Sequence, residues 1–209
     1  LDSVHTLYTS SGVSGLGNEA ITVSDSGSIA ASTLSAIAAV NTSGTIKATS
    51  AATVTGTAAE IIAAFGNSTI TEATNVAITV NSGTASLSQA RTIDGYTTGV
   101  VTATIADTRV SDLVGSSPLL DANGNNAFTV TIGTADAEIT AANLTKLNGL
   151  TSVAIEAWNV TKITGTVAAT NTVYAAAGKR AINGLGNEAV VISGESRNTL
   201  SDASTLNTL

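Results

Sequence analysis

The sequence lacks cysteine and methionine and contains few aromatic or charged residues. Its 209 residues include one proline, one histidine and one tryptophan, and aromatic residues make up 3% of the total. Without cysteine, disulfide scaffolds, structural zinc sites with thiolate ligands and cysteine nucleophiles are excluded. The sequence contains no apolar run of about 18 residues, so it predicts no membrane span. The first residues also lack the basic and apolar regions of a signal peptide.

The residues that are abundant are small. Alanine and threonine occur 35 times each, glycine occurs 19 times, and 43% of the chain is hydrophobic. This hydrophobicity argues against disorder. A formal net charge of −7 argues against nucleic-acid binding, which requires a basic surface. A regular core of small residues suits stacked repeats better than one bulky globular centre.

An internal repeat supports this interpretation. The hexapeptide GLGNEA occurs at Gly15–Ala20 and again, 169 residues later, at Gly184–Ala189. A β-type run follows each copy, and a tyrosine, Tyr8 or Tyr174, precedes each one. The motif lacks the Lys-Ser/Thr of a phosphate-binding loop and the GxGxxG spacing before a helix. We therefore expect a turn at each copy.

Strand-like and helix-like segments alternate along the chain. Strands are expected at 21–23, 46–48, 77–80, 101–104, 128–131, 153–155 and 190–192, in one parallel sheet. Short helices are expected at 30–37, 57–65, 140–147 and 166–174, with Thr57 and Thr166 as N-caps. Asp94-Gly95 and Asn148-Gly149 are expected to supply the positive φ that ends a helix.

The predicted fold is a β/α repeat solenoid, a parallel β-sheet with short helices and about 28 residues per coil. A β-rich solenoid is the alternative. We expect one array over residues 1–209, with units at 18–73, 74–124 and 125–186 and partial units at 1–17 and 187–209. Because both ends fall inside a unit, the chain is expected to be a fragment of a longer protein.

The succession of these motifs resembles a known type of repeat. It runs from GLGNEA and a strand through Ala-rich helix residues and DGYTTG to a second strand and TGTAAE. This pattern is similar to the Ala/Thr-rich repeats of giant cell-surface proteins of marine cyanobacteria and of virion proteins of their viruses. The resemblance covers nearly the whole chain and implies an extracellular structural or adhesive role, one such giant protein being tied to swimming motility.

Few residues are candidates for chemistry. Asp121, Asn123 and Asn125 come nearest to the start of a calcium loop. The match then fails, because glycine falls at position four rather than six and position twelve is Ile132 rather than glutamate. A Ser-His-Asp triad would have to use His5, the single histidine. Asp136 and Glu138, two residues apart in the sequence, are the candidate carboxylate pair for a hydrolase. Exposed surface positions explain all three residues. Asn-x-Ser/Thr sequons, which leave glycosylation open, begin at Asn41, Asn67, Asn143 and Asn159.

The sequence therefore predicts a non-catalytic structural repeat module of a large extracellular surface protein, such as a filament, layer or adhesin. The alternatives are a repeat module of a virion appendage or tail fibre and a carbohydrate- or calcium-binding module. No catalytic residue and no cofactor is predicted. The expected partners are neighbouring repeats or further copies stacked end to end, with a surface polysaccharide as a further candidate.

Overall fold

The computed structural model describes residues 1–116, 118–119 and 126–193. The chain divides into two compact units, Leu1–Thr104 and Ile105–Leu209. Both units are α/β structures in which short helices accompany parallel sheets. None of the described helices is both long and apolar enough to span a bilayer. The predicted layout of parallel strands and short helices is confirmed.

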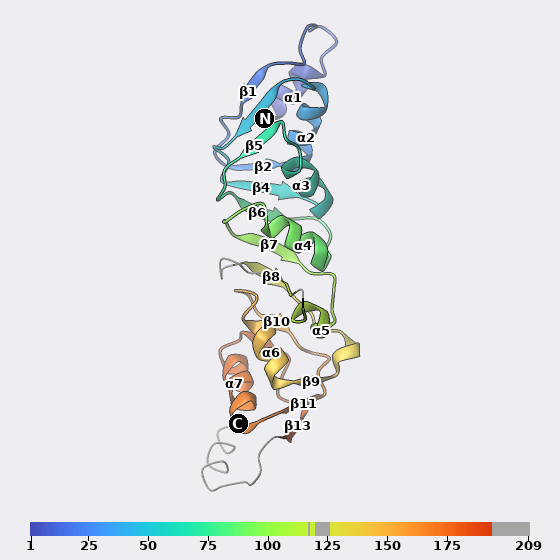
Figure 1. Cartoon of the computed structure of the whole chain (residues 1–209), viewed down its shortest axis with the longest axis vertical. Helices are drawn as coiled ribbons and strands as arrows, with labels where there is room; N and C mark the ends of the chain where they lie inside the picture. Colours follow the sequence, from blue (N-terminus) through green and yellow to red (C-terminus); the bar gives the residue numbers. More distant parts are fainter. Residues whose placement is uncertain (117, 120–125, 194–209) are drawn as a thin grey trace. The chain divides into compact units, whose positions relative to one another are not determined.

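Unit 1 contains two parallel sheets. The first has the strand order β1-β3-β5, and the second includes β2-β4-β6-β7 (Figure 1). In chain order the elements are α1 (Asp2–Tyr8), β1 (Ala20–Thr22), β2 (Ser28–Ala30), α2 (Ala31–Val40), β3 (Thr45–Ala48), β4 (Thr53–Gly56), α3 (Ala58–Phe65), β5 (Ile70–Glu72), β6 (Ala77–Val80), α4 (Leu87–Asp94) and β7 (Val101–Thr104).

The strand register in unit 1 aligns β-branched aliphatic residues. Ile29, Val54 and Ile78 occupy matching positions on β2, β4 and β6, and Val101 continues the row on β7. All four are at most 4% exposed. A shift by one residue would turn this row to the solvent, so burial fixes the register. Paired residues lie 23 to 25 positions apart, below the predicted length of about 28.

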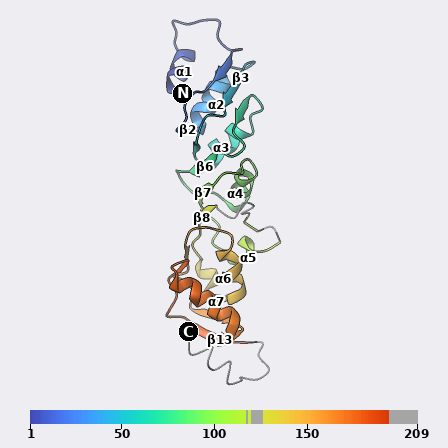
Figure 2. The same ribbon diagram turned by 90° about the vertical axis from the view of Figure 1, so that its left-hand side faces the viewer.

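The helices of unit 1 cover the sheets in sequence order. Consecutive helices pack on one another, and Figures 1 and 2 show α2, α3 and α4 following each other along the same side of the strands. Helices α2, α3 and α4 each bury residues three apart, as Ala58, Ile61 and Ala64 of α3 illustrate, whereas α1 buries none. Such a narrow apolar stripe matches helices of about two turns.

Unit 2 is built in the same way. Its sheets include β9-β11-β13 and β10-β12, and an isolated parallel bridge joins Thr131 to Glu156. Its elements are α5 (Val110–Leu113), β8 (Ala127–Thr129), the 3-10 helix η1 (Thr134–Asp136), β9 (Glu138–Thr140), α6 (Ala141–Asn148), β10 (Ile155–Glu156), β11 (Lys162–Gly165), α7 (Val167–Gly178), β12 (Ile182–Asn183) and β13 (Ala189–Ile192).

Two expectations about the strands and turns are wrong. The expected strands do not form one sheet: β1 and β3 pair in one sheet, β6 and β7 belong to the sheet of β2 and β4, β10 pairs with β12, and β13 belongs to the sheet of β9 and β11. The glycines after α4 and α6 also keep helical backbone, with φ of −69° at Gly95 and −79° at Gly149. Their amides bond to carbonyls three or four residues back, which tightens the helix end without a left-handed residue. After α7 the left-handed position is Arg180, two residues beyond the end of the helix, with φ of 60°.

The predicted N-caps are confirmed. Thr57 Oγ1 accepts from the Glu60 amide at 3.2 Å, and the Glu60 carboxylate accepts from the Thr57 amide at 2.8 Å, which completes a capping box. Thr166 Oγ1 accepts from the Ala169 amide at 3.2 Å. Each cap ends a strand and begins a helix, so one residue fixes both boundaries.

A glycine precedes both caps and permits close packing. A Cβ added at Gly165 would lie 2.9 Å from the Cβ of Ala141, the first residue of α6. Gly56 is in an equivalent place, where an added Cβ would lie 3.4 Å from the Cβ of Ala31, the first residue of α2. The Thr-Gly-Thr element thus lets each strand end lie against the start of the preceding helix.

We predict that Gly165→Ala lowers the free energy of unfolding by about 1–3 kcal/mol, because the new methyl group overpacks the contact with Ala141. Gly178→Ala is the matched control, since the last residue of α7 has open space around its Cα and gains helix propensity. Urea unfolding followed by circular dichroism measures both variants. Equal stability of the two would contradict the packing argument.

Candidate functional site

The acidic residues around one of the described cavities of unit 2 have structural partners. The cavity has a volume of about 260 Å³, and its lining includes Asp136, Glu138, Thr140 and Asn143. Asp136 Oδ2 accepts from the Val110 amide at 2.8 Å at the start of α5. Glu138 pairs with Lys162 Nζ at 2.8 Å. The two carboxylates lie on different elements, η1 and β9, and hold neighbouring segments together.

The other candidate residues do not form a reactive or metal-binding group in the described structure. His5 lies in α1, and its side chain makes no hydrogen bond to a described residue. The described residues contain no cluster of three or more His, Cys, Asp or Glu able to hold a metal ion. Asp121, Asn123 and Asn125 lie outside the described residues, so calcium binding there stays a prediction.

Both GLGNEA copies form the same turn, as predicted. The first and third residues have positive φ in each copy: 83° and 137° at Gly15 and Gly17, and 86° and 125° at Gly184 and Gly186. Only glycine adopts these angles at little cost, so the two glycines set the path of the chain. A strand, β1 or β13, starts within two residues of the turn.

A glutamate closes each turn, and an upstream tyrosine holds it. In the first copy Glu19 Oε2 accepts from the Gly17 amide at 2.8 Å and from Tyr8 Oη at 2.8 Å. In the second copy Glu188 accepts from the Gly186 amide at 2.7 Å and from the hydroxyl of Tyr174. The tyrosines belong to α1 and α7, so one carboxylate ties each turn to the preceding helix.

These contacts shift the pKa of the acids and phenols in opposite directions. The Gly17 amide, helped by Tyr8, holds the pKa of Glu19 below its usual value. Burial opposes ionisation of Glu188, but the Tyr174 hydroxyl and the turn amides outweigh it, so its pKa is also lowered. Burial, with the hydrogen bond to Glu19, raises the pKa of Tyr8 to about 12. The carboxylates therefore stay charged and the phenols neutral at ordinary pH.

A second set of contacts connects consecutive strands through side-chain hydroxyls. Thr97 Oγ1 donates to the Val76 carbonyl at 2.6 Å and accepts from the Gly99 amide at 2.9 Å. In unit 2, Thr151 Oγ1 donates to the Phe128 carbonyl at 2.8 Å. Each threonine bridges to a segment 21 or 23 residues earlier. We call these contacts the hydroxyl clamps.

The residues after the clamp threonines repeat the connection. Thr98 donates its amide to the Thr74 carbonyl at 2.8 Å, and Ser152 donates its amide to the Asn126 carbonyl at 2.8 Å. Their hydroxyls reach the same carbonyls at 3.2 and 2.9 Å. The joint motifs of the sequence are therefore also equivalent in structure.

Asn41 makes the corresponding connection next to the first turn. Its Oδ1 accepts from the Glu19 amide at 3.0 Å, and its Nδ2 donates to the Glu19 carbonyl at 2.8 Å. The side chain is fully buried. Glycosylation of Asn41 is incompatible with this arrangement, because a glycan would be attached to the same Nδ2. Asn67, Asn143 and Asn159 are partly exposed.

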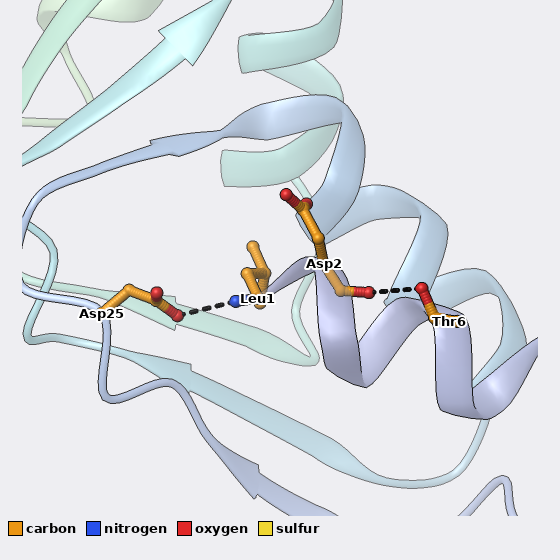
Figure 3. A network of polar contacts seen from close by, with 4 residues as sticks. All are labelled: Leu1, Asp2, Thr6 and Asp25. Atoms are coloured by element: carbon orange, nitrogen blue, oxygen red, sulfur yellow. Dashed lines mark hydrogen bonds and ion pairs between the residues drawn. The ribbon is translucent and has the colours of Figure 1, made fainter.

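At the start of unit 1, one ion pair ties the residue before α1 to the β1–β2 connection, and one hydrogen bond lies within α1. The α-amino group of Leu1 lies 2.8 Å from Asp25 Oδ2, and Thr6 Oγ1 donates to the Asp2 carbonyl at 2.9 Å (Figure 3). The ion pair with the amino group lowers the pKa of Asp25. Helix α1 also packs against α2.

No protein-family model, no curated protein and no solved structure matches this chain.

We predict that Tyr174→Phe destabilises the protein by about 1 kcal/mol, because Glu188 loses a hydrogen bond to its charged form in a partly exposed place. Tyr96→Phe is the control: Tyr96 stacks on Phe65 with ring centroids 5.3 Å apart, and its hydroxyl has no described partner. Thermal unfolding measures both changes. Equal effects would contradict a role for the Tyr174 hydroxyl.

The same contact predicts a pH dependence. The folded pKa of Glu188 is lowered, so its contribution to stability is present above its ordinary pKa of 4.5 and is lost as the pH falls below it. The destabilisation by Glu188→Gln should therefore be largest near neutral pH and shrink towards pH 3. A difference that is constant over this range would contradict the argument.

Proposed function

We propose that this chain is a non-catalytic structural repeat module, a β/α solenoid segment of a large extracellular surface protein. The observation that carries the proposal is the regular separation of paired strands, 23 to 25 residues in unit 1 and 24 to 27 in unit 2. One helix and two strands fill most of these intervals, and the interval between β6 and β7 holds one strand and one helix. A coil of this kind pairs with the preceding coil at every strand.

The contacts between coils support a structural role. The aligned aliphatic rows bury apolar surface between coils at about 25 cal/mol per Å². The hydroxyl clamps and Asn41 satisfy backbone groups of the preceding coil. The side chains of the aliphatic rows, the hydroxyl clamps and Asn41 therefore all contact a neighbouring coil, as expected for a rod or layer. The extracellular location rests on the resemblance to cyanobacterial surface repeats, and antibody labelling of intact cells or purified virions would locate the protein.

The edge of β13 supports stacking on a further coil. Val190 continues the row of Ile139 and Ile163, yet it is 38% exposed whereas those residues are at most 6% exposed. Val191 is 43% exposed, and within the described residues no strand pairs with the outer edge of β13. An apolar, uncharged edge strand is a template for another strand. We propose that a further coil or copy pairs there.

Deleting one coil tests the solenoid. Ala48 pairs with Glu72 one coil later, so removal of residues 49–72 lets Ala48 take the place of Glu72 and keeps every later contact in phase. We expect a protein that still unfolds cooperatively, with a melting temperature within about 10 °C of the parent. Removal of residues 61–72 is the out-of-phase control and should abolish cooperative unfolding. If both deletions unfold the protein equally, the solenoid is refuted.

Sedimentation equilibrium tests the stacking. The average mass should rise with concentration, and Val190→Lys should weaken association at least tenfold, because the charge would be buried at the new strand pair. Ser88→Lys adds the same charge to an exposed position of α4 and should leave association unchanged. A chain that stays monomeric at all concentrations would remove the stacking proposal while leaving the deletion result to decide the solenoid.

A further inference from the structure

Trp158 is the most exposed large hydrophobic residue described. It is the single tryptophan of the chain and is 70% exposed, whereas the next most exposed large hydrophobic residue of unit 2, Val191, reaches 43%. It lies two residues after the end of β10, in a turn closed by a 3.0 Å hydrogen bond from the Val160 amide to the Ala157 carbonyl. Burial therefore does not explain why a tryptophan stands here.

The indole is nevertheless held in place. Its Nε1 donates to Glu156 Oε2 at 2.6 Å, and the other oxygen of Glu156 accepts from Asn183 Nδ2 at 2.8 Å. A Cβ added at Gly184 would lie 2.7 Å from Cδ2 of the indole, so the second GLGNEA turn lies directly against the tryptophan. The ring is therefore preorganised by its hydrogen bond to Glu156, which Asn183 holds in turn, and by the backbone contact, although most of its surface faces solvent.

Polar side chains form a row next to the ring. Thr131, Glu156 and Asn183 occupy matching positions on three successive strand segments, and the inward residues of the pair, Ile155 and Ile182, are at most 2% exposed. Neighbouring strands are about 4.8 Å apart. The row therefore offers a hydroxyl, a carboxylate and an amide at regular intervals beside the aromatic surface.

We propose that Trp158, Glu156, Asn183 and Thr131 bind a neutral hexopyranose glycan. The aromatic face, which is electron-rich, packs against the C–H face of a pyranose ring. The carboxylate of Glu156 uses one acceptor site for the indole and one for Asn183, which leaves acceptor sites for sugar hydroxyls. The amide oxygen of Asn183 and the hydroxyl of Thr131 extend the recognition along the row.

The surroundings favour a neutral glycan over other ligands. Glu156 is negatively charged and would repel uronic acids or sulfated sugars. A protein partner would need a larger apolar core around an aromatic anchor, but Trp158 is flanked by Glu156, Asn183 and the half-buried Asn159. A single aromatic plane with adjacent hydroxyl-binding groups matches one sugar ring and its neighbours. This site would add ligand binding to the structural role proposed above, and it does not depend on that role.

The single tryptophan makes the site directly measurable. Titration of the full chain with cellohexaose, maltohexaose and mannohexaose should change the emission of Trp158 saturably with at least one of them. Native gels containing the corresponding soluble polysaccharide should retard the protein. Trp158→Ala should abolish the retardation, Trp158→Phe should weaken it, and Glu156→Gln should weaken binding several-fold. Val153→Ala, which truncates another exposed hydrophobic residue of unit 2, should leave it unchanged.

Three outcomes would overturn the proposal. One is the absence of any emission change or retardation with all three neutral glycans. Another is retardation that persists in Trp158→Ala. The last is binding of oligogalacturonate alone, which would assign the site to an anionic ligand. Matched melting temperatures of the variants would show that any lost binding is not lost folding, and Trp158→Ala should fold because so little of the indole is buried.

Discussion

A strand of three or four residues followed by a helix of two turns cannot fold alone. Helices shorter than about 12 residues are marginal in water, and an isolated strand pair is little better. In this chain each such piece gains stability only by lying against the next, in a register set by one aliphatic residue per strand, such as Val54. The hydroxyl clamps and the Thr-Gly-Thr junctions all serve to keep that register.

Much of the layout could be predicted from sequence because local signals coincide with the tertiary ones. Thr57 and Thr166 are N-caps both by the sequence pattern and in the structure. The strand predicted at 46–48 matches β3 to within one residue. The strands that lead into α2, α3, α6 and α7 were not predicted, since a segment such as Ser28-Ile29-Ala30 has one large apolar residue and no periodicity to detect. Its strand character comes from pairing with Thr53–Gly56, which lies 25 residues away.

The contacts of the candidate site were harder to predict from the sequence. The recurrence of a tyrosine upstream of each GLGNEA copy was visible, but the carboxylate it holds becomes evident only when the turn brings Glu19 back towards α1. The burial of Asn41 had no sequence signal, because a sequon in a threonine-rich chain looks the same whether it is exposed or internal. The exposed position of Trp158 likewise depends on the turn after β10.

The hydroxyl clamps have a consequence for the solution conditions under which the fold persists. They join a neutral hydroxyl to a backbone carbonyl, as Thr97 does to Val76 and Thr151 to Phe128. Dissolved ions screen charges over a Debye length of about 3 Å at 1 M salt, and this screening acts on ion pairs rather than on hydrogen bonds between neutral groups. The Lys162–Glu138 ion pair is the exception among the strand-to-strand contacts described above. Charge screening at high salt should therefore weaken the hydroxyl clamps less than it weakens this ion pair.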